Sequence, residues 1–408
     1  MIAADVIVIG GGAAGFFTAI NTVEKNPKLK VIILERGKDV LTKVKVSGGG
    51  RCNVTHAEFI PKELTAHYPR GEKELLGPFH TFMTGDTIEW FEKRGVELKI
   101  EEDGRMFPVT DSSQTIIDCF LSETKRLGIE VLLHQAVKAV QKEGELFKVE
   151  TPSEVFSAER IVLATGSNPK VWKLLESLGH SIVPPVPSLF TFNIKDLRII
   201  DLPGLATNAS VKVMLNEKAI LESEGPLLIT HWGMSGPAIL KLSAWGARLL
   251  EPSKYHFNIQ VNWLEYLSET EAFEELKSLK NDFGKQTILK YAQFDLPKRL
   301  WQNLVKAAGI SESLTWAEAT KENLQNLANQ LTAGIFEVNG KSTFKEEFVT
   351  AGGVDLKEVN FKTFESRVQP NLYFAGEVLN IDAITGGFNF QSAWTGGYLV
   401  AQAISIKP

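Results

Sequence analysis

The sequence predicts an α/β fold in which a nucleotide-binding domain is interrupted by a β-rich insert, and that insert by a small helical module. The first 35 residues have the apolar pattern of a strand, a glycine turn, a helix and a second strand. After residue 189 the pattern changes to the alternation of half-buried antiparallel strands, and over residues 264–331 it becomes helical and charged. A buried strand at 372–374 and a helix over 388–404 then return to the first domain.

The first strand, Val6–Ile9, is followed at once by Gly10, Gly12 and Gly15, which fit the spacing G-x-G-x-x-G. In this motif the first glycine permits the turn, the second lets a pyrophosphate approach the backbone, and the third lets the helix pack on the strand. Free amides at the start of the helix hold the phosphate oxygens. Glu35, at the end of the second strand, is placed to accept a hydrogen bond from a ribose hydroxyl. The segment therefore predicts a site for an adenine dinucleotide.

The remainder of the first domain is expected to alternate between helices and short strands. A helix is expected near Thr84–Lys93, and Asp111–Ser113 is an N-cap cluster for another. The proline-rich run at 183–188 predicts a domain boundary. Strands are expected in the first domain at residues 130–133, 137–141, 146–150, 155–156 and 161–163, and in the insert at 190–194, 211–215, 257–261 and 333–338.

The C-terminal strand ends in Gly376 and Glu377, and the turn Thr385–Asn389 then opens the last helix. An acid at a strand tip can hold a polyol hydroxyl, and a helix N-terminus places positive potential beside an electron-accepting ring. A flavin needs both contacts, because its ribityl chain carries hydroxyls and its reduced pyrimidine edge carries negative charge. These features predict FAD as the cofactor. The alternative is a helix that packs on the sheet beside an incidental glutamate.

The segment Ser47–Asn53 contains three consecutive glycines. Ordering glycines costs conformational entropy, so we expect positive φ angles or a close approach to a flat group. Cys52 is a weak candidate for a redox thiol, and the more frequent alternative is a small buried side chain near the cofactor. Arg51 and Lys43 are candidates for contacts to phosphate or to flavin carbonyl oxygens, with ordinary solvated cations as the alternative.

Two further segments carry weaker catalytic candidates. Arg105, within Gly104–Pro108, has the charge to hold an anionic substrate group, or it belongs to a structural turn. His231, within Thr230–Pro237, is a candidate acid or base facing the flavin, although a hydrogen-bonded structural histidine is more frequent. No histidine pair has the spacing of a metal site, and no second G-x-G-x-x-G marks a separate NAD(P)H domain.

Composition sets limits on partners and location. The net charge of −5 provides no basic surface for nucleic acid or anionic lipid, and no apolar run is long enough to span a membrane. The two cysteines, Cys52 and Cys119, are far apart in sequence, which argues against a disulfide framework. We therefore expect a soluble cytoplasmic protein whose partner is a small-molecule substrate, and the oligomeric state stays open.

These segments together resemble the bacterial BaiN/RdsA-type family of NAD(P)/FAD-dependent oxidoreductases with an inserted domain. The resemblance spans nearly the whole chain, and its most specific motifs are Ser47–Asn53 and Thr230–Pro237. It implies a glutathione-reductase-type, Rossmann-like FAD-binding domain. Its expected domains are the FAD-binding domain at 1–187 and 340–408, the β-barrel-like insert at 188–263 and 332–339, and the helical subdomain at 264–331.

The resemblance also implies how the cofactor is held. The backbone at Val137 would meet the adenine, while Arg51, Cys52 and Asn53 would line the flavin region. Three positions depart from the family pattern and leave the substrate preference open: His56, Asn380 and Ala383. The complete set of expected cofactor-binding residues is Gly10, Gly12, Ala14, Gly15, Glu35, Arg36, Lys43, Ser47, Gly49, Arg51, Cys52, Asn53, Val137, Thr165, Gly166, Gly376, Glu377, Gly387, Phe388 and Asn389.

The predicted function is that of a FAD-dependent oxidoreductase that acts on a small organic substrate by hydride transfer through flavin N5. NADH or NADPH is a candidate transient reductant. One alternative is a flavin-dependent amine oxidase that uses oxygen, and another is a non-catalytic flavin redox sensor. The acidic balance of charge argues against a third alternative, a flavin-dependent RNA-modifying protein.

Overall fold

The computed structural model describes residues 1–342 and 349–406, and the chain forms two compact units. Met1–Pro187 and Lys345–Pro408 make up the first unit, and Ser188–Phe344 make up the second. The first unit is therefore discontinuous in sequence. The finer three-part division expected from the sequence stays a prediction.

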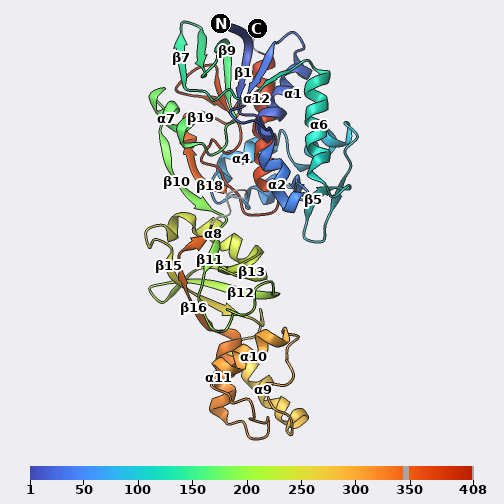
Figure 1. The fold of residues 1–408 in the computed structure, drawn as a ribbon, viewed down its shortest axis with the longest axis vertical. Helices are drawn as coiled ribbons and strands as arrows, with labels where there is room; N and C mark the ends of the chain where they lie inside the picture. Colours follow the sequence, from blue (N-terminus) through green and yellow to red (C-terminus); the bar gives the residue numbers. More distant parts are fainter. Residues whose placement is uncertain (343–348, 407–408) are drawn as a thin grey trace. The chain divides into compact units, whose positions relative to one another are not determined.

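The first unit is built on a nine-stranded sheet, most of whose strands follow the order β19-β20-β21-β9-β1-β2-β6, with a β7–β8 hairpin added beside β9 (Figure 1). Five neighbouring strands, from β21 to β6, pair in parallel. Their carboxyl ends therefore meet at one edge of the sheet, which is where ligands bind in such folds. The strands are β1 Ile2–Ile9, β2 Val31–Leu34, β6 Glu130–Leu132, β7 Ala139–Glu143, β8 Leu146–Glu150, β9 Val155–Leu163, β19 Val359–Asn360, β20 Glu365–Ser366 and β21 Leu372–Phe374.

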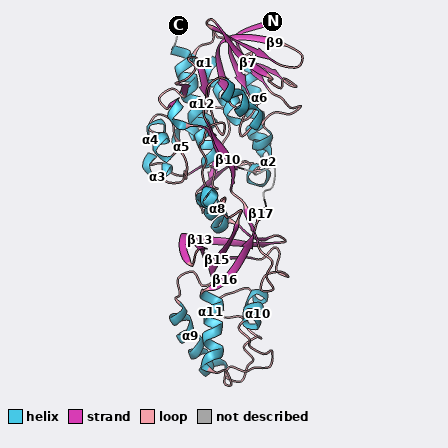
Figure 2. Cartoon of the chain, turned by 90° about the vertical axis from the view of Figure 1, so that its left-hand side faces the viewer, coloured by secondary structure: helices cyan, strands magenta, loops and turns pink. Residues whose placement is uncertain are grey.

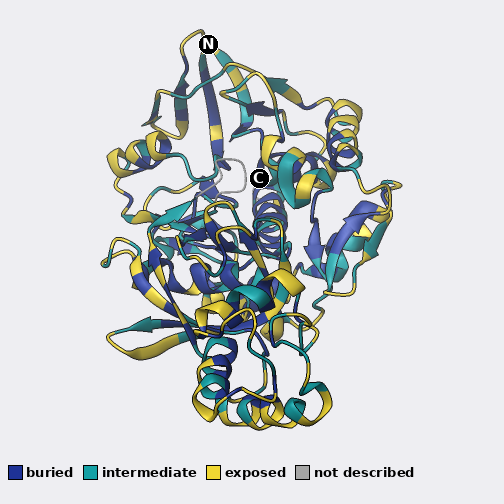
Figure 3. Ribbon diagram, turned by 60° about the horizontal axis from the view of Figure 1, so that its bottom comes forward, coloured by how far each residue is buried: buried dark blue, intermediate teal, exposed yellow. Residues whose placement is uncertain are grey.

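Helices cover this sheet, and the first and last of them, α1 and α12, lie side by side (Figure 1). The two helices approach closely at Gly397, where an added Cβ would lie 2.9 Å from the hydroxyl of Thr18. Figure 3 shows buried residues on the inner strands and helices and exposed residues in the loops around them. The helices are α1 Ala13–Lys25, α2 Thr42–Gly50, α3 Pro61–Thr65, α4 Glu72–Phe79, α5 Thr84–Glu92, α6 Ser113–Arg126, α7 Pro169–Ser177 and α12 Phe388–Ile406, with a 3₁₀ turn at Leu356–Glu358.

The structure corrects one sequence-based expectation in the first unit and adds two features to the others. The runs at 155–156 and 161–163 belong to one continuous strand, β9. The proline-rich run at 183–188 ends the first unit, but it is also a strand, β10 (Ile182–Ser188), paired with β18 (Val349–Val354). Proline is tolerated there because this two-stranded sheet leaves edges that need no donor. A three-stranded sheet of β3 (Thr55–His56), β5 (Arg105–Pro108) and β4 (Leu98–Ile100) was not expected.

The second unit combines an antiparallel sheet, in the order β16-β15-β12-β13-β14-β11-β17, with four helices. In Figure 2, α9, α10 and α11 gather apart from β13, β15 and β16. The helices nevertheless share one hydrophobic core with the sheet, which includes Trp263, Trp301 and Phe336. The elements are β11 Thr191–Asn193, β12 Ala206–Leu215, β13 Lys218–Thr230, β14 Gly233–Ser235, α8 Pro237–Leu250, β15 His256–Asn262, α9 Glu269–Phe283, α10 Lys298–Ala307, α11 Lys321–Thr332, β16 Gly334–Asn339 and β17 Lys341–Ser342.

Among the residues that the structure describes, no helix has the length and apolar character needed to cross a membrane.

Candidate functional site

The glycine turn between β1 and α1 has the three roles that its spacing predicts. Gly10 has φ +115°, and a Cβ there would lie 2.3 Å from the carbonyl oxygen of Ala164. A Cβ at Gly15 would lie 2.0 Å from the carbonyl oxygen of Gly10, so α1 meets the turn backbone to backbone. A Cβ at Gly12, by contrast, would have no atom within 4 Å. Gly12 is also the N-cap of α1 and supplies no capping side chain, so the first amides of the helix face an open space.

Glu35, just after β2, is hydrogen-bonded to the glycine turn. Its carboxylate accepts hydrogen bonds from the backbone N–H groups of Gly11 at 2.8 Å and Gly37 at 2.7 Å. These bonds fix the carboxylate beside the glycine turn and leave further acceptor capacity on each oxygen. Arg36 follows on the exposed side of the chain. The position of Glu35 is therefore compatible with a ribose hydroxyl as an additional donor.

The ends of β9 and β21 complete the edge of the sheet beside α1. An added Cβ at Gly376, where φ is +74°, would lie 3.0 Å from the Cβ of Ala14. Thr165 and Gly166 follow β9, and an added Cβ at Gly166 would lie 3.7 Å from Oε2 of Glu377. The structure thus brings the turns after β1, β9 and β21 together, as the expected cofactor site requires.

Glu377 follows β21 and is held by an ion pair and a backbone hydrogen bond at the carboxyl edge of the sheet. Lys43 of α2 donates from Nζ to its Oε2 at 2.5 Å, and the backbone N–H of Thr350 on β18 donates to its Oε1 at 3.2 Å. The ion pair joins residues 334 positions apart in the sequence. Lys43 and Glu377, two separate predictions from the sequence, are therefore one structural unit, and Lys43 neutralises the carboxylate that is expected to hold a polyol hydroxyl.

The three glycines of Ser47–Asn53 adopt the positive φ angles expected for them, with Gly48 at +57°, Gly49 at +69° and Gly50 at +86°. They break α2 at its end, where Ser47 already has extended backbone angles. Gly48 lies against a ring, because an added Cβ would come within 2.8 Å of Phe107. A Cβ at Gly49 would have no atom within 4 Å, so the backbone of Gly49 is open to a ligand.

Cys52 is sealed inside the protein. Its side chain is fully buried, its φ is +63°, and its backbone N–H donates to Ser47 at 3.0 Å. Burial raises the pKa of the thiol to about 12, so almost none of it is thiolate near neutral pH. Cys119 is also buried, and its pKa is likewise raised to about 12. The geometry supports the small buried side chain and gives no support to a redox thiol.

Asn53 ties the glycine segment to the start of α12. With its amide oriented to satisfy its neighbours, it donates to the carbonyl oxygens of Thr55 at 3.0 Å and Met106 at 3.3 Å and accepts from the N–H of Gly387 at 3.0 Å. Gly387 has φ +95°, and a Cβ there would lie 2.5 Å from the Thr55 carbonyl oxygen. Asn389 closes the same loop by two hydrogen bonds with the backbone of Ala383.

Phe388, the first residue of α12, is held in an aromatic stack. The rings of His56 and His67 stack on it with centroid distances of 4.5 and 4.2 Å. His56 Nδ1 lies 3.0 Å from the carbonyl oxygen of Gly386, and burial lowers the pKa of the His56 ring. A neutral His56 therefore supports the loop that leads into α12.

Both arginine candidates are engaged with acids rather than free for a ligand. Arg51 forms an ion pair with Glu101 at 2.5 Å, and its guanidinium lies over the ring of Phe107 at 3.9 Å. Arg105 pairs with Asp103 at 2.6 Å and with Glu101 at 3.2 Å. These contacts support the structural turn for Arg105, and they give Arg51 a structural ion pair that neither of its two sequence-based alternatives included.

Two other predicted residues take part in none of the contacts described above. Val137 is half-buried in the loop before β7. His231 lies in the second unit, exposed at the turn between β13 and β14 beside the exposed Trp232. Gly233 fixes that turn, since a Cβ there would lie 2.2 Å from the carbonyl oxygen of Phe192.

Sequence reasoning missed several residues that position the site. Arg70 and Asp382 form two charge-assisted bonds, one of them from Nε to Oδ1 at 2.5 Å, and the Asp382 side chain is fully buried. Gln391 of α12 accepts hydrogen bonds from the hydroxyls of Thr55 at 2.6 Å and Thr87 at 2.9 Å. Each pair is separated by more than 300 residues, so no local spacing could reveal it.

The geometry of the described residues is itself compatible with FAD. The N-terminus of α1 faces open space at Gly12, which suits a pyrophosphate. Glu377 stays partly exposed, and its carboxylate, held by Lys43 and by the Thr350 N–H, keeps acceptor capacity for a hydroxyl group.

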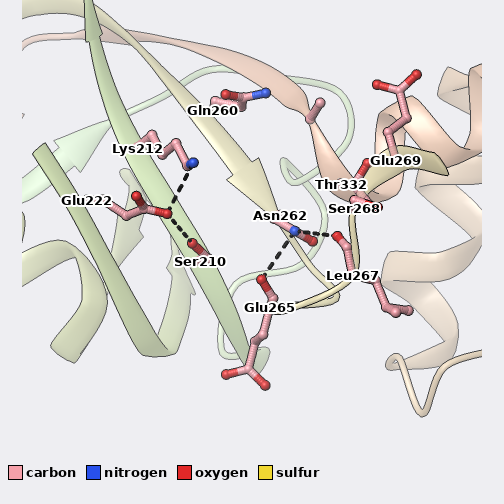
Figure 4. A pocket seen from close by; sticks show the side chains of 11 residues that line it. Ser210, Lys212, Glu222, Gln260, Asn262, Glu265, Leu267, Ser268, Glu269 and Thr332 are labelled. Atoms are coloured by element: carbon pink, nitrogen blue, oxygen red, sulfur yellow. Dashed lines mark hydrogen bonds and ion pairs between the residues drawn. The ribbon is translucent and has the colours of Figure 1, made fainter. Parts of the chain in front are cut away.

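A cavity of about 300 Å³ in the second unit is a different kind of feature (Figure 4). Its polar groups satisfy one another, since Glu222 accepts from both Lys212 and Ser210, and Asn262 donates to the carbonyls of Glu265 and Leu267. None of the predicted cofactor-binding residues lines it.

Fold and site together define a flavoprotein oxidoreductase with an α/β Rossmann-type FAD-binding fold. The chain belongs to the HI0933-like family, which is the BaiN/RdsA-type family that its sequence resembles, because residues 4–403 match the model of the HI0933-like protein Rossmann domain. This confirms the family, the fold class, the FAD cofactor and the enzyme class expected from the sequence.

Two curated relatives align over almost the whole chain. The 3-dehydro-bile acid delta(4,6)-reductase of Clostridium scindens is 27% identical over 98% of this chain and 99% of its own length. The ribosomal RNA dihydrouridine synthase of Escherichia coli is 30% identical over 98% of this chain and 97% of its own length. Among solved structures, 3-ketosteroid delta1-dehydrogenase from Sterolibacterium denitrificans has a TM-score of 0.54 at 11% identity, covering 99% of this chain and 100% of that one, and shows the shared fold.

Two glycine variants separate binding from folding in the turn. Gly12→Ala places a methyl group in open space, so we expect the free energy of unfolding to change by less than about 1 kcal/mol while FAD binds about tenfold more weakly. Gly15→Ala forces a methyl group against Gly10, so we expect a loss of roughly 1–3 kcal/mol of stability. Urea unfolding of the apoprotein and FAD titration measure both. Equal effects of the two substitutions on unfolding would contradict these assignments.

Cys52 offers a second test. We expect the native protein to resist alkylation at this position at about pH 8, although an ordinary thiol with a pKa of about 8.5 reacts there. The unfolded protein should react at both Cys52 and Cys119. Peptide mass spectrometry after treatment with iodoacetamide measures this, and rapid modification of Cys52 in the folded protein would show that the thiol is accessible.

Proposed function

We propose that this flavoprotein reduces a carbon–carbon double bond conjugated to a carbonyl group, with NADH or NADPH as reductant. The supporting observation is the flavin-type edge around Lys43 and Glu377, together with the burial of Cys52 and Cys119, whose thiol pKa values are strongly raised. A dithiol relay is therefore not available among the described residues. FAD, when bound, supplies hydride transfer at its ring N5.

The names of the relatives support the same bond type. One relative is named as a reductase of a delta(4,6) bile acid that carries a 3-dehydro group, and the other as a synthase of dihydrouridine. Each activity saturates a ring double bond that is conjugated to a carbonyl. This shared chemistry favours conjugated-bond reduction over amine oxidation, the alternative expected from the sequence.

In this proposal the residues of the chain bind the flavin and orient it. The Lys43–Glu377 ion pair, anchored by the Thr350 N–H, holds a carboxylate in place for a polyol hydroxyl. The Arg70–Asp382 pair fixes the loop that precedes α12. Reduction of the double bond also consumes a proton, and His231 stays the candidate donor expected from the sequence. Of the other two catalytic candidates, Cys52 is fully buried and Arg105 is ion-paired.

Two classes of substrate are candidates. The sequence-based expectation is a small organic substrate and no nucleic acid, and the name of the bile-acid reductase relative supports a small conjugated carbonyl compound within that class. The relative from Escherichia coli favours a uracil ring within ribosomal RNA, the second candidate. Both substrates present the same reacting group, so the chemistry proposed here does not depend on the choice between them.

The experiment is an anaerobic assay of the holoenzyme with NADPH or NADH and two substrate panels, 3-oxo steroids with conjugated double bonds and ribosomal RNA that lacks dihydrouridine. Mass spectrometry should show the gain of two hydrogens in one panel. His231→Gln should lower turnover by roughly 10²-fold or more while the flavin is still reduced at the wild-type rate. Failure to reduce either panel, combined with oxidation of amines by oxygen, would replace this function by the oxidase alternative.

A further inference from the structure

A basic groove lies in the first unit, formed by β7 and α7, and no part of the proposed chemistry uses it. Its volume is about 600 Å³, within the range of ligand sites. Four lysines contribute to its lining, and no lining residue is acidic. The lining residues are Lys138, Ala139, Val140, Gln141, Lys142, Lys170, Lys173, Leu174, Ser177 and Leu178.

The lysines are arranged so that their charges converge. Lys138 and Lys142 are four residues apart along an extended segment, which places both on the same face. Lys170 and Lys173 are three residues apart on α7, which makes them neighbours on the helix surface. Two like-charged pairs thus face one groove from a strand and from a helix.

These ammonium groups are not neutralised within the described part of the chain. No ion pair involving Lys138, Lys170 or Lys173 is found among the described residues, and Lys142 donates from Nζ to the carbonyl oxygen of Pro370 at 2.9 Å. Like charges at this spacing repel one another, and a concave surface lined by one sign of charge concentrates counter-ions. In a chain with net charge −5, this local excess of positive charge is unlike the overall balance.

We propose that this lysine groove binds the phosphate groups of a nucleotide ligand. Lysine is a flexible point-charge donor suited to phosphate, and four of them in a groove of this size can contact more than one phosphate group. Phosphate is the chemistry shared by a pyridine-nucleotide reductant and by an RNA backbone. The inference deepens the proposed function, since it locates where the reductant or an RNA substrate is held, but its test measures binding and needs no turnover.

The test compares wild-type holoenzyme with the double variant Lys170→Glu/Lys173→Glu. The matched control is Lys62→Glu/Lys73→Glu, which changes the net charge equally at exposed lysines of α3 and α4 outside the groove. The probes are NADP⁺, NAD⁺, inorganic phosphate and a single-stranded RNA oligonucleotide, titrated at several salt concentrations. Circular dichroism checks that all three proteins are folded.

We expect the groove variant to bind at least one phosphate probe about tenfold more weakly, with the control unchanged. If RNA is the ligand, the slope of log K against log salt falls by about 1.4, which is about 0.7 for each lost phosphate contact. If the reductant is the ligand, the loss appears for NADP⁺ or NAD⁺ and not for RNA. Binding of every probe by the groove variant as by wild type and control, or no binding of any probe by wild type, would overturn the proposal.

Discussion

The contact between the start of α1 and the turn that precedes it is the constraint on which the rest of the site depends. An added Cβ at Gly15 would lie 2.0 Å from the Gly10 oxygen, and one at Gly10 would lie 2.3 Å from the Ala164 oxygen. Only bare backbone can pack this closely. The same packing brings α1 against Gly376 and Gly397, so the turns after three parallel strands and the last helix are all positioned by one glycine turn.

The parts of the site that the sequence predicts are those encoded by local spacing. The glycine motif with Glu35, the positive φ angles at Gly48–Gly50 and the strand tip at Glu377 each follow from residues close together in the chain. The main strands of the first sheet were predictable for the same reason, because strands buried on both faces form continuous apolar runs. The Rossmann-type fold class follows from these elements.

The rest depends on contacts between distant segments, which single-sequence patterns do not contain. The Lys43–Glu377 pair, the Arg70–Asp382 pair and the hydrogen bonds of Gln391 each cross more than 300 residues. Arg51 and Arg105 carry the charge expected of ligand contacts, but both pair with acids in the turn between β4 and β5. The prolines at 183–188 predict a domain boundary and give no sign of strand β10, although an edge strand accepts proline.

The central claim is that this edge of the sheet holds a flavin that a pyridine nucleotide reduces. The most direct measurement is the visible absorption spectrum of the purified protein, followed without oxygen while NADPH or NADH is added. The proposed function predicts a flavin spectrum that bleaches on addition of one of them and returns when a conjugated carbonyl substrate follows. A protein that neither contains nor takes up FAD, or a bound flavin that stays oxidised with both nucleotides, would contradict the account.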